Sequence, residues 1–396
     1  MRNKLIVGMV AMLMFWGSEG IAVDKPLPSE ESEQITPVLA QLLSEPYVAQ
    51  LSDGTFCLNY ELIISNAIKT EVNIESIEIV DPTSADLKIG ELKKAEIQEN
   101  ISLPAATQPT TTLAPGQAGY LRINLAFSQN KQVPSVLEHV ISLAIDKPYR
   151  TLLSHMSERV ARAEVCTEQK VVIGPPLKGK DWVAVAVGKD SYHRKAIMPL
   201  NGRWFAPERW AVDWIQLTDE NRLVTGDPAK NESYPQYGKE IIAVSDGIII
   251  SVRDDLADTP PGKLPENITL QDAAGNCIVQ DIGGGYSALY AHLKPGSIRV
   301  KKGQRVRRGQ VIALLGNSGN TDAPHLHFHV IKGKLPLVSD GVPYVIDSFI
   351  LKTQAVSSDF LETEFKNNEI VKIEAVKNAG KRHKEMPQNL AIVEFP

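Results

Sequence analysis

Apolar and polar residues alternate along residues 72–80, Val-Asn-Ile-Glu-Ser-Ile-Glu-Ile-Val, as they do in a half-buried β-strand. A proline at position 37 after Thr36 instead predicts a short helix through about Leu43. Several short strands with turns between them favour an immunoglobulin-like β-sandwich for this part of the chain. Its other predicted strands cover residues 57–65, 118–127, 138–145 and 162–173.

A second alternating pattern, at residues 325–329, places three histidines at every second position of a predicted strand. His325, His327 and His329 would then project from one face, while Leu326 and Phe328 point into a core. Neutral imidazole is a common metal ligand and carries protons near neutral pH. A solvated, histidine-rich strand face is the alternative, but a further histidine motif just upstream favours chemistry.

The same patterns divide the chain into segments. Consecutive prolines in residues 174–180, Gly-Pro-Pro-Leu-Lys-Gly-Lys, break both helices and strand ladders and predict a linker. The predicted organisation is a signal peptide (1–22), an N-terminal extension (23–50), the β-sandwich (51–173), the linker (174–180), a second β domain (181–350) and a C-terminal extension (351–396).

The first residues have the features of an export signal. Arg2 and Lys4 precede an apolar run, residues 5–16, that is too short to span a bilayer. Small residues up to Ala22 predict cleavage near that position. No later stretch is long and apolar enough for a membrane helix, so we expect an exported protein, periplasmic or secreted, without a membrane span in its mature form.

Composition narrows the function. The 396 residues are 43% hydrophobic and have a net charge of −5, which gives no general attraction to nucleic acid. The basic run at residues 301–308 is interpreted as a solvated strand and turn face. Of the cysteines, Cys57 and Cys166 either pair, leaving Cys277 alone, or all three are buried thiols. None has the spacing of a zinc site.

Four motifs follow one another in the second half of the chain: Tyr290-Ala291-His292-Leu293, two Lys/Arg-Gly-Gln turns ending at Gln304 and Gln310, Gly316-Asn317-Ser318-Gly319, and Pro324-His325-Leu326-His327. This ordered series resembles the catalytic domain of the lysostaphin/LytM-type zinc endopeptidases, which cut peptide cross-links in bacterial cell walls. The resemblance covers about residues 184–350. It implies a peptidase domain built on an antiparallel β-sheet, of the duplicated hybrid motif type.

The resemblance also implies roles for particular residues. In that family zinc is held by a His and an Asp four residues apart and by the second His of His-x-His, which place ligands at Asp213 and His327. His292 and His325 would then lie beside the reacting water. One of them would take its proton, and the other would stabilise the oxyanion or protonate the leaving amine.

One position departs from the family pattern: Arg209 stands four residues before Asp213, where the first zinc ligand is expected. A guanidinium has no lone pair for a metal, so the natural alternative is an ion pair with Asp213 in the place of the metal. The sequence leaves open whether Arg209 forms this pair or turns into solvent. His329 and His193 are candidate substitute ligands. For His193, a position in a surface loop is the simpler expectation.

Two main hypotheses remain. The first is an exported zinc endopeptidase that hydrolyses peptide bonds of peptidoglycan, and it is favoured by the joint presence of the four residues Asp213, His292, His325 and His327. The second is a metal-free relative that binds peptidoglycan or regulates another cell-wall hydrolase, and it is favoured by Arg209. A purely structural envelope protein is a third alternative.

Overall fold

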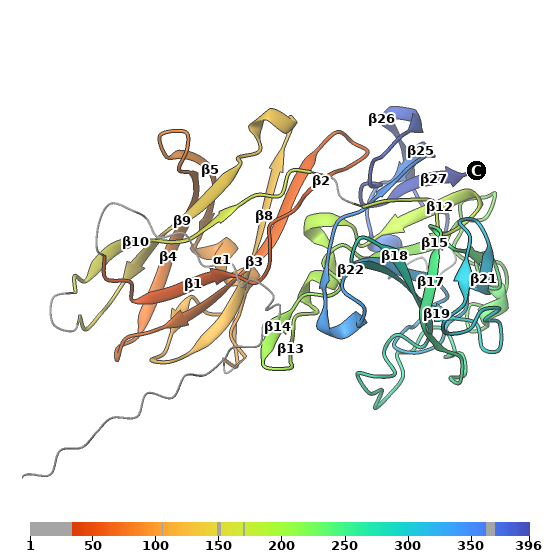
Figure 1. The fold of residues 1–396 in the computed structure, drawn as a ribbon, viewed down its shortest axis with the longest axis horizontal. Coiled ribbons are helices and arrows are strands. Elements are labelled where there is room, and N and C mark those ends of the chain that lie inside the picture. The colour runs from red at the N-terminus through yellow and green to blue at the C-terminus, as the bar shows by residue number, and fades with distance from the viewer. Residues whose placement is uncertain (1–33, 105, 149–151, 169–170, 362–368) are drawn as a thin grey trace, which may run out of the picture.

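The computed structural model describes residues 34–104, 106–148, 152–168, 171–361 and 369–396. It confirms a mainly β protein with antiparallel sheets, arranged as an N-terminal and a C-terminal β region side by side (Figure 1). The predicted signal peptide lies outside the described residues. Among the residues that are described, no helix has the length and apolarity needed to cross a membrane.

Two five-stranded antiparallel sheets form the N-terminal region, with one short helix, α1 (Lys94–Asn100), beside them. The first sheet contains β1 (Val38–Leu42), β2 (Val48–Gln50), β3 (Phe56–Asn66), β6 (Ile101–Ser102) and β8 (Ala118–Phe127). The second contains β4 (Val72–Asp81), β5 (Leu87–Lys93), β7 (Thr112–Leu113), β9 (Val136–Ala144) and β10 (His155–Glu164).

One hydrophobic core joins these two sheets. It contains Leu58 and Leu62 from β3, Ile74 and Ile77 from β4, and Ile97 from α1, all fully buried. Side chains alternate across each strand, so every second residue reaches this core. The region is therefore a two-sheet sandwich, whereas its immunoglobulin-like character stays a prediction.

The start of the sandwich differs from the sequence prediction. Residues 36–43 do not form a helix: Val38–Leu42 is strand β1, paired with β3, and β2 also pairs with β3. The hydrogen-bond ladder that β3 provides outweighs the local helix-start signal, since tertiary pairing routinely overrides propensity. Residues 38–50 thus belong to the sandwich sheet and not to an extension. The last predicted strand is also displaced, because β10 ends at Glu164 and only β11 (Val172–Ile173) follows.

The C-terminal region is built on an eleven-stranded sheet. In spatial order its main path is β20 (Arg305–Val306), β17 (Gly247–Arg253), β18 (Asn276–Gly283), β19 (Tyr286–Leu293), β22 (Leu326–Lys332), β15 (Val212–Gln216), β12 (Gly179–Val185), β27 (Ala391–Phe395), β25 (Phe349–Ala355) and β26 (Ile373–Arg382), with β23 (Asp340–Gly341) paired to β22. Three two-stranded pairs complete it: β11 with β24 (Val345–Ile346), β13 (Met198–Leu200) with β14 (Arg203–Phe205), and β16 (Glu240–Ile242) with β21 (Val311–Leu314).

The C-terminal tail is part of this sheet. The sequence predicts edge strands at residues 371–376 and 391–395 with an exposed loop between them, but β26 continues to Arg382 and β27 lies between β12 and β25. Strand β27 is buried because its Val393 and Phe395 pack into the main core. Residues 351–396 are therefore an integral part of the second region and not an appendage.

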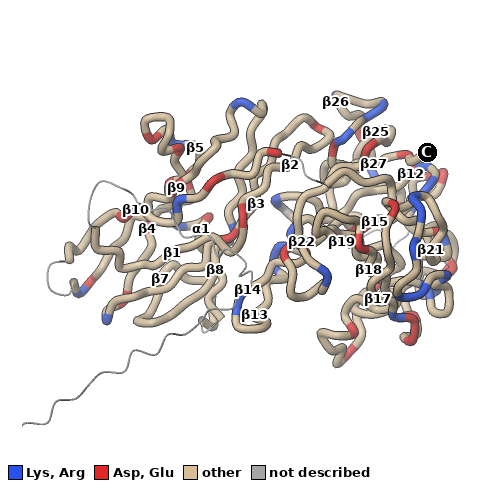
Figure 2. Tube along the Cα trace, viewed as in Figure 1, with Lys and Arg blue, Asp and Glu red and all other residues tan. Residues whose placement is uncertain are grey.

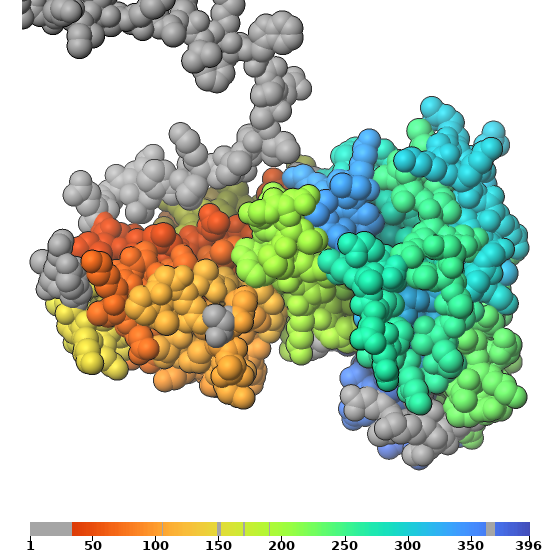
Figure 3. Space-filling model, turned by 90° about the horizontal axis from the view of Figure 1, so that it is seen from below, coloured from red at the N-terminus to blue at the C-terminus, as the bar shows by residue number. Residues whose placement is uncertain are grey.

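A shared core also connects the two regions. Tyr47, Leu51 and Cys57 from the sandwich belong to the same buried cluster as the C-terminal sheet. A smaller cluster joins Tyr120 on β8 to Trp204 in the β13–β14 hairpin. In the space-filling view the yellow-green segment containing this hairpin fills the space between the orange sandwich and the rest of the second region (Figure 3).

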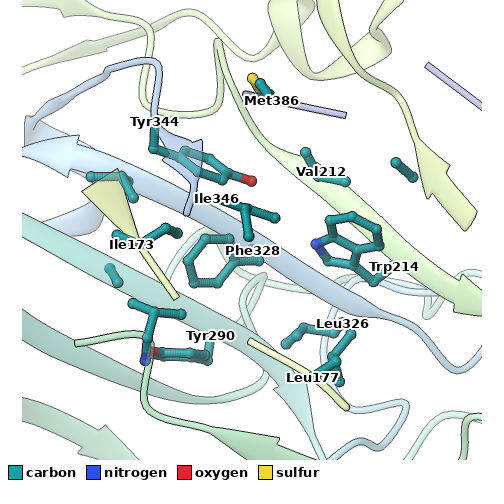
Figure 4. Packing of buried hydrophobic residues seen from close by; sticks show 14 of the residues in the cluster. Ile173, Leu177, Val212, Trp214, Tyr290, Leu326, Phe328, Tyr344, Ile346 and Met386 are labelled. Atoms are coloured by element: carbon teal, nitrogen blue, oxygen red, sulfur yellow. The ribbon is translucent and has the colours of Figure 1, made fainter. Parts of the chain in front are cut away.

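The face of the C-terminal sheet opposite the histidines is apolar. Leu326 and Phe328 point into a cluster with Trp214, Tyr290 and Tyr344, and all five side chains are fully buried (Figure 4). This packing confirms the predicted division of β22 into a core face and a histidine face. The histidine strand β22 is thereby packed against the hydrophobic core along its apolar face.

Two further sequence predictions can be compared directly. The basic residues of the run 301–308 are exposed along β20 and the turns beside β21, as expected of a solvated face (Figure 2). Cys57, Cys166 and Cys277 are all free thiols, so the pairing of Cys57 with Cys166 is not formed. Only Cys57 among them is fully buried.

Candidate metal centre and active site

Neighbouring strands bring Asp213 and His327 together. β15 and β22 pair antiparallel with Asp213 directly opposite His327. The His327 Nδ1 atom lies 3.0 Å from Asp213 Oδ1, and both residues are buried. Sheet register alone therefore places a carboxylate oxygen and an imidazole nitrogen at one point.

His193 completes this cluster. It lies in the 3₁₀ turn η3 (Tyr192–Lys195), whose first turn is capped by the Ser191 hydroxyl accepting from the His193 backbone N–H. Its Nε2 atom is 3.1 Å from Asp213 Oδ2, and the residue is only 5% exposed. The expectation of a surface-loop histidine is therefore wrong: the turn folds inward over Asp213.

Arg209 adopts neither of the two orientations considered for it, an ion pair with Asp213 or a side chain turned into solvent. Its guanidinium does not bind Asp213 but donates from Nε to Glu61 Oε2 at 2.8 Å, in the core of the structure. Glu61 lies at the boundary between the two regions and accepts from Arg194 as well. His193, and not Arg209, lies beside the Asp213 carboxylate.

His292 and His325 face the same cluster from two other elements. The Nδ1 atom of His292 lies 2.8 Å from Ser318 O, and that of His325 lies 2.9 Å from Ala323 O. A carbonyl oxygen only accepts, so Nδ1 carries a proton in both rings, and Nε2 has a lone pair whenever the ring is neutral. His292 adopts a left-handed φ of 61°, a strained conformation that the surrounding structure imposes.

His329 lies behind His327 and not beside Asp213. Its Nδ1 atom is 2.9 Å from His327 Nε2, and the two rings meet edge to face. A carboxylate only accepts, so in the ion-free protein His327 Nδ1–H donates to Asp213 Oδ1 and His327 Nε2 accepts from His329 Nδ1–H. If a metal replaced the proton on Nδ1, the proton would lie on Nε2 and His329 Nδ1 would accept from it. The structure thus places His329 as a neighbour that orients His327.

Two overlapping groups of side chains could accept a metal ion: His193 with Asp213 and His327, and His292 with His325 and His327. In each group the ligand atoms lie within 4.8 Å of one another. The first group fits zinc better because it supplies three protein ligands including an anionic oxygen, the set usual for a catalytic zinc. In the second group, His292 and His325 have Nε2 atoms that are available for proton transfer.

Charge in the cluster is strongly coupled. Burial alone would raise the pKa of Asp213, but the imidazoles of His193 and His325 hold it well below its ordinary value. Burial alone would likewise lower the pKa of His193, whereas the Asp213 carboxylate raises it. Burial and the neighbouring imidazoles lower the pKa of His292 and of His329, so both rings stay neutral.

A cavity of about 1400 Å³ opens onto these residues. Its lining includes all the histidines of both groups together with apolar side chains such as Leu264, Leu289 and Leu337. Tyr192 also lines it and donates its phenol hydroxyl to Asp213 Oδ2. A chain with both polar and apolar groups can therefore reach the cluster.

Two residues of this site have no signal in the sequence analysis. Tyr192 is adjacent to His193, and a search for tyrosines next to candidate ligands would have found it. Glu61 lies on β3, far away in the sequence from its partner Arg209, and no spacing rule connects such residues. Only the fold identifies it.

Residues 233–338 match the model of Peptidase family M23, so the second region contains an M23 peptidase domain and the family resemblance is confirmed. The match includes His292, His325 and His327 but not His193 or Asp213. Peptidoglycan DD-endopeptidase ShyA of Vibrio cholerae is 40% identical over 88 residues, which are 20% of this chain and 20% of that protein.

Two other similarities extend further along the chain. An uncharacterized metalloprotease of Haemophilus influenzae is 38% identical over 185 residues, 43% of this chain and 38% of its own. The catalytic domain of lysostaphin from Staphylococcus simulans is 20% identical over 36% of this chain and 80% of that domain, with a TM-score of 0.21. The chain thus spans about a fifth of the length of ShyA and less than two-fifths of the second relative.

Proposed function

We propose that this protein is an exported zinc endopeptidase that hydrolyses peptide bonds in bacterial peptidoglycan, with His193, Asp213 and His327 as zinc ligands. One observation carries the proposal: His193 occupies the place that Arg209 leaves, 3.1 Å from the Asp213 carboxylate. The donor set of two imidazoles and one carboxylate suits zinc. The peptidoglycan endopeptidase among the relatives supports the choice of substrate.

Each ligand has a defined orientation before any ion binds. Asp213 presents one oxygen to His193 and the other to His327, and the hydrogen bond to His329 holds the His327 ring with Nδ1 toward Asp213. Bound zinc would polarise the scissile carbonyl as a Lewis acid and make water a stronger nucleophile near neutral pH. Ligand binding would displace the proton shared between His193 and Asp213, so zinc affinity should rise with pH.

Proton transfer falls to the two remaining histidines. His325 is partly exposed to the cavity and directs Nε2 toward Asp213, at 3.5 Å from Oδ1, so it can take a proton from an attacking water. His292 is buried and stays neutral, so it accepts a hydrogen bond at Nε2. The centroids of the two rings are 4.7 Å apart, so both serve one reacting centre.

The location of the protein is part of this proposal. Peptidoglycan lies outside the cytoplasmic membrane, and residues 1–22 have the charge and apolar pattern of an export signal. A metal-free protein that binds peptidoglycan or regulates another hydrolase is the second candidate. Its main support, Arg209, is weakened because Arg209 is turned away from Asp213.

The test is the zinc content of the purified mature protein, measured by elemental analysis together with hydrolysis of purified peptidoglycan. We expect about one zinc per chain, lost together with hydrolysis in His193→Ala. The exposed His155 gives a matched control, and His155→Ala should keep both. Absence of zinc after equilibration with excess metal would reject the metal site and leave the regulatory alternative.

A further inference from the structure

A carboxylate of the sandwich region binds two arginines that flank the candidate metal site. Glu61 lies on β3 and is completely buried. Its Oε1 atom is 3.0 Å from Arg194 Nη2, and its Oε2 atom is 2.8 Å from Arg209 Nε and 2.5 Å from Arg209 Nη2. Both arginines are buried as well, so three buried charges meet at this point.

Each arginine is close in sequence to a proposed zinc ligand. Arg194 follows His193 directly in the turn η3, and Arg209 stands four residues before Asp213. The two ligands come from different elements, a 3₁₀ turn and a strand, and Glu61 is a point to which both elements are attached. A shift of Glu61 would therefore move His193 relative to Asp213.

Backbone contacts reinforce this attachment. Arg194 Nη2 also donates to Tyr60 O at 3.2 Å and to Ile123 O at 3.3 Å, so the guanidinium is inserted against β3 and β8 of the sandwich. Arg209 Nη1 donates to Gly341 O at 3.3 Å, in the strand that pairs with β22. The network therefore connects the sandwich to the strand neighbours of His327 as well.

We propose that Glu61 is a positioning residue for the metal centre, acting through Arg194 and Arg209 to hold His193 and Asp213 at the separation that zinc needs. This inference rests on the proposed function. A buried ion triad is costly to desolvate, and apolar side chains of the same volume are often as stable or more so, so its presence indicates a role in alignment. Zinc sites tolerate little error in the placement of their ligands.

The test is the zinc affinity of Glu61→Gln, measured by competition with a chromogenic chelator, alongside its stability in urea. Glu138→Gln is the matched control, because Glu138 is a buried sandwich carboxylate that pairs with Arg159 and not with the site. We expect Glu61→Gln to weaken zinc binding at least about tenfold, the loss typical for an outer-shell partner of a metal ligand. Glu138→Gln should bind zinc like the wild type, even where its stability falls.

Wild-type zinc affinity in a folded Glu61→Gln variant would overturn this inference while leaving the proposed function intact. If that variant does not fold, Glu61→Asp decides, because it keeps the charge but withdraws the carboxylate by one methylene. Folded Glu61→Asp should bind zinc more weakly than the wild type, and equal affinity would overturn the inference. Failure of the wild type to bind zinc would instead reject the proposed function itself.

Discussion

Two buried carboxylates, Glu61 and Asp213, are both connected to the same two short segments of the chain, residues 193–194 and 209–213, and Asp213 also contacts His327 from β22. Arg194 and Arg209 neutralise Glu61, whereas their close neighbours His193 and Asp213 itself meet at the other site. The first cluster contains only guanidinium donors. The second contains imidazoles, each with a lone pair when neutral.

This difference separates a permanent ion pair from a site that can exchange ligands. A guanidinium cannot lose its proton or bind a metal, so the Glu61 cluster has one state. An imidazole can give up a proton and bind a cation instead, so the Asp213 cluster has two. Arg209 binds the other carboxylate, so under the proposed function it does not mark a lost metal site.

The largest expected effect is on the exchangeable cluster. His327→Ala removes a proposed ligand that contacts Asp213 directly, so we expect loss of bound zinc and of peptidoglycan hydrolysis to the background rate. Elemental analysis and release of soluble muropeptides check this. A variant that kept full zinc content and hydrolysis would show that the ion is held elsewhere.

A mutation in the Glu61 cluster should lower the free energy of unfolding. Arg209→Gln leaves Glu61 with one cation, and breaking a buried ion pair costs about 3–5 kcal/mol of unfolding free energy. Equilibrium unfolding in urea measures it. Arg203→Gln is the control because the Arg203–Asp340 pair is mostly exposed on the arginine side, and its loss should cost about 1 kcal/mol or less. Equal losses of unfolding free energy in the two variants would mean that burial of the Arg209–Glu61 pair adds nothing to stability.

A third buried carboxylate, Glu158 on β10, has no cationic partner among the described residues and sharpens the comparison. Burial raises its pKa to about 8, and its Oε2 accepts from the Val38 backbone N–H at 3.3 Å. The folded state then keeps a proton that the unfolded state loses near pH 4.5, so the stability of the wild type falls as pH rises from there to about 8. Glu158→Gln cannot ionise and should be more stable than the wild type at pH 8, by an amount on the order of a few kcal/mol.

A histidine of the same core, His139, determines the pH range in which this measurement is made. Burial lowers the pKa of His139 to about 4, so its contribution to stability increases with pH between there and its ordinary value of 6.5. Urea unfolding between pH 6.5 and 8 therefore reports on Glu158 alone of the two. A wild-type stability that does not fall in this window would contradict the assignment.

The smallest effect is expected at His329, which contacts the zinc site only through His327. His329→Leu removes the acceptor that His327 Nε2–H would need once Nδ1 binds zinc, and it should weaken zinc binding about 10- to 100-fold. His329→Gln retains an acceptor and should stay near the wild-type affinity. Chelator competition distinguishes the two, and equal affinities for Leu and Gln would show that the hydrogen bond does not orient His327.

Local patterns predicted much of this molecule. The alternation in residues 325–329 predicted the histidine face and the apolar face of β22, because side-chain direction in a strand depends only on neighbouring residues. The alternation in residues 72–80 predicted β4 in the same way. Motif order was enough for the peptidase domain.

Contacts between distant residues were beyond such patterns. Arg209 was assigned to Asp213 because they are close in sequence, yet its partner Glu61 lies 148 residues away. His193 was expected in a surface loop because nothing near it indicates burial. The tail strand β27 was expected at an edge, since its neighbours β12 and β25 cannot be inferred from its own residues.

The separation in sequence between Glu61 and its arginines also bears on the order in which the protein folds. Glu61 precedes Arg194 by 133 residues and Arg209 by 148, and all the strands of the sandwich are made before either arginine emerges. Domains generally fold in order from the N-terminus as the chain emerges, so we expect the sandwich to close while this carboxylate still lacks its cations. At that stage Glu61 is a buried carboxylate without a cation, and it favours docking of the segment that contains Arg194 and Arg209 in a single register. The contact that aligns the finished site thereby also sets the order of its assembly.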